Sequence, residues 1–523
     1  MKRSLSLIFV LAAAALLGGC AVLPERVASP PTYALSDVAD TRLARVAAAA
    51  TPANKQGLSG FRLLPEAQTA FNARIALVRR AEKSLDVQYY LIKNDEVGQI
   101  FLRELRDAAQ RGVRVRLVID DLYTGDEEDL LVGLAACPNV EVRVFNPLPA
   151  RAGPLGLRLL FSLQEFRRIN HRMHNKLLVA DNSFAVSGGR NIADEYFMHS
   201  QAANFIDLDV LSSGPVVREL SVLFDSYWNS EQVYPIARIA AQVPPPEAAR
   251  QRFDAIVHDA AAGVPERPND VLGHPPLAQQ LDGDGPLLTF ASAQVFADTP
   301  EKAAGLWPGS IAGTATERAL NLFSSARKEV NIVSPYFIPG QRGMERIRAI
   351  GATQENGRIL VVTNSLAAAD EPLVYSGYAR YRLEMLKAGV RIYELSPSLS
   401  QRSGRLGNFG KSFGRLHSKA AIIDRRWALI GSMNLDARSA SLNTEVLLAI
   451  DSPEFAGTLG RMAENALASG AYRLRLSPDG EHIEWVEQDS DGNTVVHSDE
   501  PDNSLWFRLK LWLLSKFVSE DNL

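Results

Sequence analysis

Two short segments of the sequence carry the same reactive residue types at the same spacing. In each, a lysine follows a histidine by two positions and an aspartate follows the histidine by seven. The first copy contains His174, Lys176 and Asp181, and the second contains His417, Lys419 and Asp424. Each residue lies 243 positions from its counterpart, since 417 − 174 and 424 − 181 give the same value. Because imidazole can act as nucleophile or general acid and ammonium can stabilise an anionic oxygen, the repeat predicts one paired site for phosphoryl chemistry.

A glycine-rich segment ending in asparagine follows each motif. It contains Gly188, Gly189 and Asn191 in the first copy and Gly431, Ser432 and Asn434 in the second. Glycine lets a neighbouring strand approach closely, and an asparagine amide can donate to non-bridging oxygens. Each histidine and lysine stand two apart beside an apolar run, so both should project from one side of a strand. Repetition for packing alone is a poor explanation, because lysine is rarely buried without a partner.

The elements around these motifs repeat as well. Residues 81–87 align with residues 326–332, and residues 112–118 align with residues 357–362. Each aligned segment has the pattern of a strand, with helical periodicity between strands, which predicts a largely buried sheet covered by helices. We therefore expect an α/β fold of two pseudo-symmetric sandwich halves, with mixed, largely parallel sheets and the active site between them. The halves should cover residues 57–235 and 286–470, joined by a Pro-rich linker at 236–285.

The paired motifs resemble the two HKD motifs of the phospholipase D superfamily at every defining position. The likeness runs from Phe61 to Phe455 and is nearest to bacterial cardiolipin synthases, most clearly at residues 172–176 and 188–197. It implies a mechanism in which His174 attacks phosphorus to form a phosphohistidine. His417 would protonate the departing alkoxide and later act as base. The near-symmetry of the sequence does not by itself decide which histidine takes which role.

The resemblance also implies roles for the surrounding polar residues. The groups that would stabilise the equatorial oxygens are Lys176, Lys419, Asn191 and Asn434. Asp207 and Glu445 resemble the acids that orient the histidines in this family; Asp209 competes with Asp207, and a solvent-facing acid is the alternative at both positions. We expect Asp181 and Asp424 to hold the structure by charge pairing. No metal or other cofactor is implied, because the lysines would repel a cation and a zinc pair of His171 and His174 has no cysteine ligands beside it.

The N-terminus has the pattern of a bacterial lipoprotein. Lys2 and Arg3 precede an apolar run that closes with Leu-Gly-Gly-Cys20, which predicts a signal peptide over residues 1–19 and lipidation of Cys20. Residues 20–56 would form a tether. Val22 stands where an aspartate would indicate retention in the inner membrane, so we expect a periplasm-facing anchor in the outer membrane. This departs from the many cardiolipin synthases that carry transmembrane helices.

The remaining segments indicate contact with lipid. Basic residues precede each motif, among them Arg151, Arg158 and Arg172, and could steer an anionic head group or simply form a solvated loop. An apolar run at residues 155–166 lies among them. Residues 471–523 should form a hairpin and an amphipathic segment that either lies in a membrane interface or docks onto the core.

Three classes of function remain open from the sequence. The first is a phosphatidyl transferase acting on phosphatidylglycerol, with phosphatidylethanolamine as a further candidate substrate. The second is a hydrolase, either a phospholipase D or a nuclease, and the third is a non-catalytic membrane scaffold. The intact motifs argue against the scaffold, and a net charge of −4 with a lipid anchor argues against nucleic acid as a partner. Phospholipids and a membrane surface are therefore the expected partners.

Overall fold

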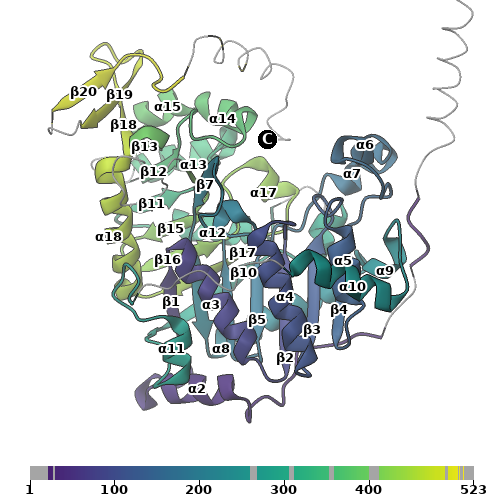
Figure 1. Cartoon of the computed structure of the whole chain (residues 1–523). Coiled ribbons are helices and arrows are strands. Elements are labelled where there is room, and N and C mark those ends of the chain that lie inside the picture. The colour runs from purple at the N-terminus through teal and green to yellow at the C-terminus, as the bar shows by residue number, and fades with distance from the viewer. Residues whose placement is uncertain are drawn as a thin grey trace, which may run out of the picture.

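A computed structural model describes most of the 523-residue chain and shows two similar halves (Figure 1). The described residues are 22–26, 30–258, 268–305, 311–352, 359–399, 412–488, 493–503, 506 and 511. Cys20 and nearly all of the C-terminal amphipathic segment lie outside them. The first half, purple to blue in Figure 1, lies below the green and yellow second half.

The first half is built on one sheet with helices on both faces. Its strand order is β9-β4-β3-β2-β5-β6-β8-β1. The strands are β1 (Ser59–Leu64), β2 (Ser84–Tyr89), β3 (Arg114–Asp120), β4 (Val140–Phe145), β5 (Leu177–Ala180), β6 (Phe184–Gly188), β8 (Asp209–Ser213) and β9 (Val233–Pro235). The helices are α3 (Ala67–Arg80), α4 (Glu96–Gln110) and α5 (Glu128–Ala135) on one face and α8 (Pro215–Trp228) on the other. Strand alternation divides the core accordingly, because Leu117 and Ile119 face the first group while Val118 packs on the side of α8.

The second half repeats this order with two further strands, β19 and β20. Its sheet runs β10-β17-β16-β15-β11-β12-β13-β18-β19-β20. The strands are β10 (Thr289–Ala297), β11 (Val330–Val333), β12 (Ile359–Asn364), β13 (Arg391–Leu395), β15 (Ala420–Ile423), β16 (Trp427–Gly431), β17 (Val446–Asp451), β18 (Ala471–Leu476), β19 (Ile483–Gln488) and β20 (Thr494–His497). The helices are α12 (Ala315–Ser324), α13 (Gly340–Ala352), α14 (Pro372–Ala379), α15 (Arg382–Lys387), α17 (Ala437–Ser441) and α18 (Pro453–Gly470). The expected hairpin forms from β18 and β19.

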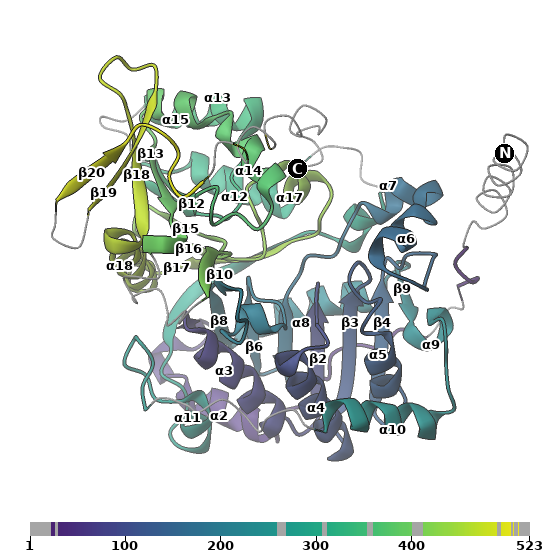
Figure 2. The same ribbon diagram turned by 45° about the horizontal axis from the view of Figure 1, so that its top comes forward.

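The two halves are joined by a shared strand and a shared core. The first residues of β10 pair with β1 and the remaining residues pair with β17, so one strand belongs to both sheets. A cluster of buried side chains from the α8 face and the α18 face lies between the sheets, where the rings of Phe61 and Phe455 meet edge to face at 6.1 Å. The two halves therefore pack face to face (Figure 2).

The sheets are mixed, as predicted, but the expectation that they are largely parallel is wrong. Within the two large sheets, the parallel pairings among the described residues are those of β2, β3 and β4 and of their counterparts β11, β12 and β13, and the other described pairings are antiparallel. The strands after the motifs are instead joined by tight hairpins, in which Asp181 and Asn182 have φ of 46° and 47° and Asp424 and Arg425 have φ of 54° and 56°. Two consecutive residues with positive φ match a type I′ turn, although three residues separate the last strand pair in each hairpin, Ala180 with Phe184 and Ile423 with Trp427.

The segments expected to be a tether and a linker are partly folded. Within residues 20–56, helix α2 (Arg42–Ala50) packs onto the first half with Leu43 fully buried. Within residues 236–285, three helices lie on the first half: α9 (Ile236–Ile239), α10 (Pro246–Val257) and α11 (Leu277–Asp282). The prolines that suggested a linker start helices here, because proline at the first helical position loses no hydrogen bond.

Candidate active site

Short segments of the two halves pair with each other immediately before the residues of the site. Strand β7 (Ala203–Ile206) pairs in parallel with β14 (Phe413–Leu416), and these strands lead into Asp207 and His417. On the other side, Met173 bridges Thr444, and these two residues precede His174 and Glu445. Each histidine is therefore placed beside an acid of the opposite half.

The supporting acids lie within hydrogen-bonding distance of the imidazoles. Nδ1 of His174 is 3.1 Å from Oε1 and 3.0 Å from Oε2 of Glu445, and Nδ1 of His417 is 2.6 Å from Oδ2 of Asp207. Asp209, the competing candidate, instead pairs with two buried arginines of the first half. Since Nδ1 of each ring donates to a carboxylate, Nε2 is the nitrogen left for substrate.

The two motif lysines are buried beside their histidines. Lys176 is 1% exposed and donates from Nζ to the carbonyl oxygen of His174, and Lys419 makes the same contact with His417. These residues lie just before β5 and β15, and not inside a strand as the sequence suggested. Burial lowers the pKa of Lys176 to about 7 and that of Lys419 to about 8. A bound anion would favour their charged forms, so the site is suited to a phosphodiester.

The two histidines differ in their electrostatic surroundings. Burial, the two lysines and His417 hold the pKa of His174 well below its ordinary value, which favours the neutral ring. Burial and Lys419 also lower the pKa of His417, but the carboxylate of Asp207 opposes that shift. Burial alone would raise the pKa of Asp207, yet the charge and hydrogen bond of His417 hold it far below its usual range. The carboxylate of Asp207 therefore favours the charged form of His417, although burial and Lys419 still leave the pKa of His417 below its ordinary value.

The pKa of Glu445 is shifted in the opposite direction from that of Asp207. Burial raises the pKa of Glu445 to about 7, although the charge of Lys176 and hydrogen bonds from Ser432 and Ser439 oppose the shift. The backbone N–H of Glu445 donates to Asp298, which also pairs with buried Lys302. Sequence reasoning missed Ser439 and Asp298, because neither belongs to the repeated pattern.

Aromatic side chains flank both imidazoles. The ring of Tyr90 lies 5.1 Å from that of His174, edge to face, and the rings of Tyr196 and Phe205 lie 5.1 and 4.8 Å from that of His417. In the sequence, an aromatic pair follows the first repeated strand of each half, Tyr89–Tyr90 and Tyr336–Phe337, but no contact with an imidazole was predicted for Tyr90 or Tyr196. These rings fix the orientation of the imidazoles and keep them in an apolar setting.

The two asparagines are buried at the edge of the site. Nδ2 of Asn191 donates to the hydroxyl of Tyr196 at 2.9 Å, and the backbone N–H of Asn434 donates to Ser439. Among the residues that the structure describes, the side-chain oxygens of both asparagines have no hydrogen-bond partner. These unpaired oxygens can only accept a hydrogen bond, so donation to a phosphate oxygen would have to come from the Nδ2 groups, one N–H of which is already used in Asn191.

The motif glycines stand where side chains would collide with the acid-bearing strand. A Cβ at Gly188 would lie 2.2 Å from Oδ1 of Asp209, one at Gly189 would lie 2.1 Å from Oδ1 of Asp207, and one at Gly431 would lie 2.0 Å from the carbonyl oxygen of Val446. Ser432 takes the position of Gly189 in the second half and hydrogen-bonds Glu445. This position is therefore where the two copies differ next to the acids.

Asp181 and Asp424 hold the structure, but not by the charge pairing that we expected. Asp181 accepts backbone N–H groups from Glu82, Lys83 and Ser84 at 2.8 to 2.9 Å. Asp424 accepts the equivalent N–H groups of residues 327–329. Each carboxylate thus fastens the hairpin turn to the start of the neighbouring strand.

A polar residue at the end of a parallel strand positions each motif. Asp120, the last residue of β3, accepts from the guanidinium of Arg172 at 3.1 Å and from the backbone N–H of Met173 at 2.9 Å. Asn364, the last residue of β12, accepts from the backbone N–H of Leu416 and donates to its carbonyl oxygen. Both residues are recognisable in the sequence as polar residues at the end of a strand-like segment, but no role was predicted for them.

The described part of the chain contains neither a cluster of metal ligands nor a helix able to cross a membrane. Residues 22–26, 30–258 and the later described ranges contain no group of three or more side chains placed to bind a metal ion, and His171 instead contacts the carbonyl oxygen of Lys302. In the same ranges no helix has the length and apolarity needed to cross a membrane.

Comparison with known proteins identifies the family. Residues 75–228 and 319–466 match the family described as "Cardiolipin synthase, PLD-like domain". The chain is 36% identical to cardiolipin synthase C of Escherichia coli over 488 residues, covering 90% of this chain and 98% of that protein. It is 27% identical to cardiolipin synthase A of Pseudomonas fluorescens over 406 residues, covering 77% and 67%.

A solved structure shares the fold. Phosphatidylserine synthase of Haemophilus influenzae superposes with a TM-score of 0.55 and 14% identity, covering 89% of this chain and 95% of that one. That likeness concerns the fold alone, whereas the sequence matches carry the assignment. The chain therefore belongs to the cardiolipin synthase family of phospholipase D-like proteins and is an enzyme of the phosphatidyltransferase class.

Proposed function

We propose that this enzyme forms cardiolipin by transferring a phosphatidyl group from phosphatidylglycerol to the head-group hydroxyl of a second lipid. The observation that carries the proposal is the crossed arrangement of the site, in which each imidazole hydrogen-bonds an acid of the other half beside a buried lysine. Such a site fits a single tetrahedral phosphorus contacted from both halves.

The assigned steps use the difference between the histidines. Nε2 of neutral His174 attacks phosphorus, and the P–O bond to the departing glycerol breaks as His417 donates its proton to that oxygen. The incoming lipid hydroxyl then loses its proton to His417 and attacks the phosphohistidine, which releases His174. Lys176, Lys419 and the two asparagines would stabilise the charge on the equatorial oxygens.

The acceptor is tested directly with the purified protein. We expect labelled phosphatidylglycerol to yield cardiolipin, and parallel reactions with and without phosphatidylethanolamine show whether that lipid also serves. Phosphatidic acid as the only product would instead make the protein a hydrolase. Cleavage of single-stranded DNA would overturn the choice of a lipid substrate.

The intermediate is tested with variants of the two histidines. His174→Ala should abolish both turnover and labelling of the protein, and His417→Ala should abolish turnover while the protein remains folded. Labelling that survives denaturation in alkali but not in acid is expected for a phosphohistidine. Turnover retained by either variant would remove the paired-site mechanism.

We further propose that the protein is a lipoprotein that faces the periplasm from the outer membrane. The support is the apolar N-terminal run that ends at Cys20, with Val22 two residues later. Cys20→Ala should release the protein from the membrane fraction, and density separation of the two membranes should place the unaltered protein with the outer one. Recovery in the inner membrane would refute the location.

A further inference from the structure

Exposed apolar side chains gather on one protrusion of the first half. The protrusion consists of α6 (Leu155–Leu160), η2 (Leu163–Glu165) and α7 (Phe166–Ile169), and we call it the α6–α7 ridge. Its exposed side chains are Leu157, Leu160, Phe161, Leu163 and Phe166, which are 37% to 55% exposed. Single exposed apolar residues are ordinary on a protein surface, but a contiguous group indicates a surface that another molecule covers.

The ridge is held rigidly in this exposed position. The guanidinium of Arg158 is buried and donates to the carbonyl oxygen of Ala150 and to Asp121 at 2.9 Å. Arg168 donates to the carbonyl oxygen of Pro147 at 2.7 Å. The sequence suggested that arginines here steer an anionic head group, but Arg151, Arg158 and Arg172 are all held in ion pairs with buried acids. They instead keep the apolar side chains turned toward solvent.

The ridge adjoins the active site. Tyr123 is 42% exposed, and its ring lies 5.6 Å from that of Tyr90, which in turn lies 5.1 Å from His174. The loop that carries Tyr123 also contacts the ridge, since a Cβ at Gly125 would lie 2.7 Å from Nη1 of Arg158. An aromatic path therefore leads from the ridge to one histidine.

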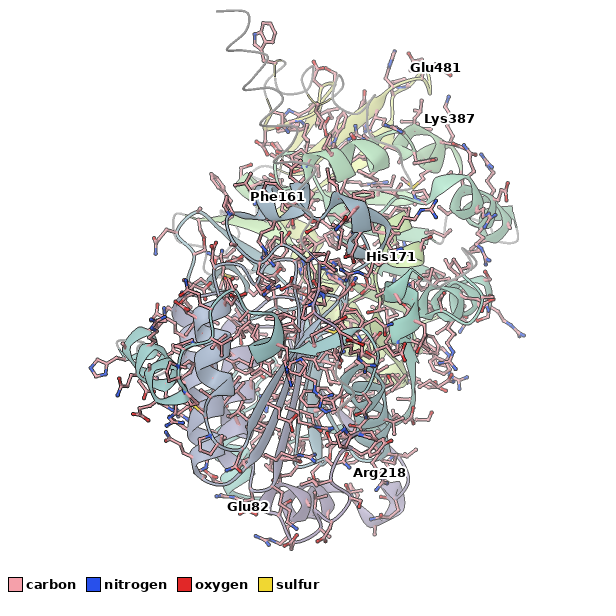
Figure 3. The ribbon with its side chains drawn as sticks, turned by 90° about the vertical axis from the view of Figure 1, so that its right-hand side faces the viewer. Glu82, Phe161, His171, Arg218, Lys387 and Glu481 are labelled. Atoms are coloured by element: carbon pink, nitrogen blue, oxygen red, sulfur yellow. The ribbon has the colours of Figure 1, made fainter. Side chains whose placement is uncertain are left out.

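Arg26, near the start of the described residues, is connected to the ridge by a series of hydrogen bonds. Arg26 donates to the carbonyl oxygen of Ser230, and two residues later Gln232 accepts from the backbone N–H of Asn146 at 2.8 Å. The side chain of Asn146 donates to the carbonyl oxygen of Arg168 in the ridge. Figure 3 shows Phe161 and His171 in the middle part of the molecule, between Lys387 and Glu481 at the top and Glu82 and Arg218 at the bottom. The hydrogen bonds through residues 230–232 and Asn146 thus connect Arg26 to the ridge.

We propose that the α6–α7 ridge is the surface by which the enzyme docks onto a phospholipid bilayer, so that a lipid head group leaving the bilayer meets His174. The proposal rests on the lipid substrate proposed above. Leucine and phenylalanine side chains enter the boundary between head groups and acyl chains, and burying them there provides the attraction. The exposed Arg167 adds a cation beside them for an anionic lipid surface.

Kinetics on two physical forms of the substrate test the proposal. In the full-length protein, the double variant Leu163→Ser, Phe166→Ser should raise the KM for phosphatidylglycerol vesicles by about tenfold or more, as expected when buried apolar area is lost. Its kcat/KM on a dispersed short-chain phosphatidylglycerol should stay within about twofold, because docking is not needed there. The control is Val222→Ser, which removes a 70% exposed apolar side chain from α8, a helix that is not part of the ridge.

Two kinetic results would overturn the docking role. Equal KM on vesicles for the double variant and the unaltered protein would show that the ridge does not contribute to docking. An equal loss on vesicles and on dispersed substrate would show that the ridge shapes the site instead.

Fluorescence of a labelled variant tests docking without turnover. It therefore remains informative if the protein converts neither form of phosphatidylglycerol, which would refute the proposed function but not the docking role. A polarity-sensitive fluorophore attached at Leu163→Cys should shift to shorter wavelength with phosphatidylglycerol vesicles, and one at Val222→Cys should not. The buried thiol of Cys137 should not compete for the label. A shift that appears with rising protein concentration and no vesicles would assign the ridge to a second copy of the chain, and no shift at all would overturn the docking role.

Discussion

Asp207→Asn should slow transfer from the lipid substrate about a thousandfold and should do much less harm to a substrate whose leaving group needs no proton. The variant keeps the shape of the side chain but removes the anion beside His417. If His417 is the general acid, its charged form becomes harder to reach and the departing alkoxide is not protonated. Glu445→Gln should fail differently, because it disturbs the ring that attacks phosphorus.

The magnitude follows from the contact between the two groups. Nδ1 of His417 and Oδ2 of Asp207 are 2.6 Å apart and both residues are buried. With the charge centres about 4 Å apart and an effective dielectric constant near 20, the attraction is about 4 kcal/mol. Since about 1.4 kcal/mol corresponds to a factor of ten in rate, the loss approaches three orders of magnitude.

The assay compares two donors, phosphatidylglycerol and a phosphatidyl ester of p-nitrophenol, in single-turnover reactions that follow loss of the donor. A nitrophenolate leaves without protonation, so Asp207→Asn should lose about tenfold or less on that ester. Glu445→Gln should lose comparable factors on both donors. Asp451→Asn, which neutralises an acid paired with Arg426 outside the site, is the control and should change neither rate.

Equal rescue of the two variants by the nitrophenyl ester would refute the assignment of different roles to the histidines. Rescue of Glu445→Gln alone would reverse the assignment and make His174 the acid. Thermal unfolding of each variant shows whether a loss of activity reflects a loss of structure.

Three further predictions concern ionisation, the hairpin turns and the glycines. The pH profile of kcat/KM should be a narrow bell. The Glu445 carboxylate is lost as the pH falls below its pKa of about 7, and the ammonium groups of Lys176 and Lys419 are lost as the pH rises past their pKa values of about 7 and about 8. A plateau from pH 5 to 10 would contradict this prediction. Asp181→Ala should reduce the free energy of unfolding by about 3 kcal/mol in urea titrations, with Asp181→Asn intermediate, because three N–H groups lose their acceptor. Gly431→Ala should cut kcat about a hundredfold by displacing the strand after Glu445, whereas Gly460→Ala, with its nearest contact at 3.6 Å, should not.

The sequence was sufficient to predict the two halves and the residues that the structure brings together. The constant offset located both motifs, and the need of each imidazole for an acceptor pointed to acids downstream. It could not show that His174 contacts Glu445 and His417 contacts Asp207, because that crossing depends on β7 and β14 pairing between the halves. Contacts between segments about two hundred residues apart leave no local pattern to read.

Local sequence features explain why some segments were predicted wrongly. Proline near residues 244–246 was interpreted as a sign of a linker, but the same residue type starts α10. Parallel strands were overcounted because the hairpin turn at Asp181 and Asn182 carries no glycine, and two consecutive positive φ values are unusual without one. The aromatic pair after the first strand repeats between the halves, as Tyr89–Tyr90 and Tyr336–Phe337, but the contact of Tyr90 with His174 was missed because it joins segments more than eighty residues apart.

The departures from symmetry are what allow a duplicated site to carry out acid–base chemistry. Two identical imidazoles would share one pKa, whereas the proposed reaction needs one ring neutral and the other charged at the start. The structure separates them through the residues behind them, since Asp207 remains an anion while burial brings the pKa of Glu445 to about 7. The contrast begins at matched positions, where Gly189 leaves space for the Asp207 carboxylate and Ser432 hydrogen-bonds Glu445. In the proposed reaction, the repeat would supply two equivalent phosphate-binding units, and the difference between Gly189 and Ser432 behind the histidines would favour one direction of proton transfer.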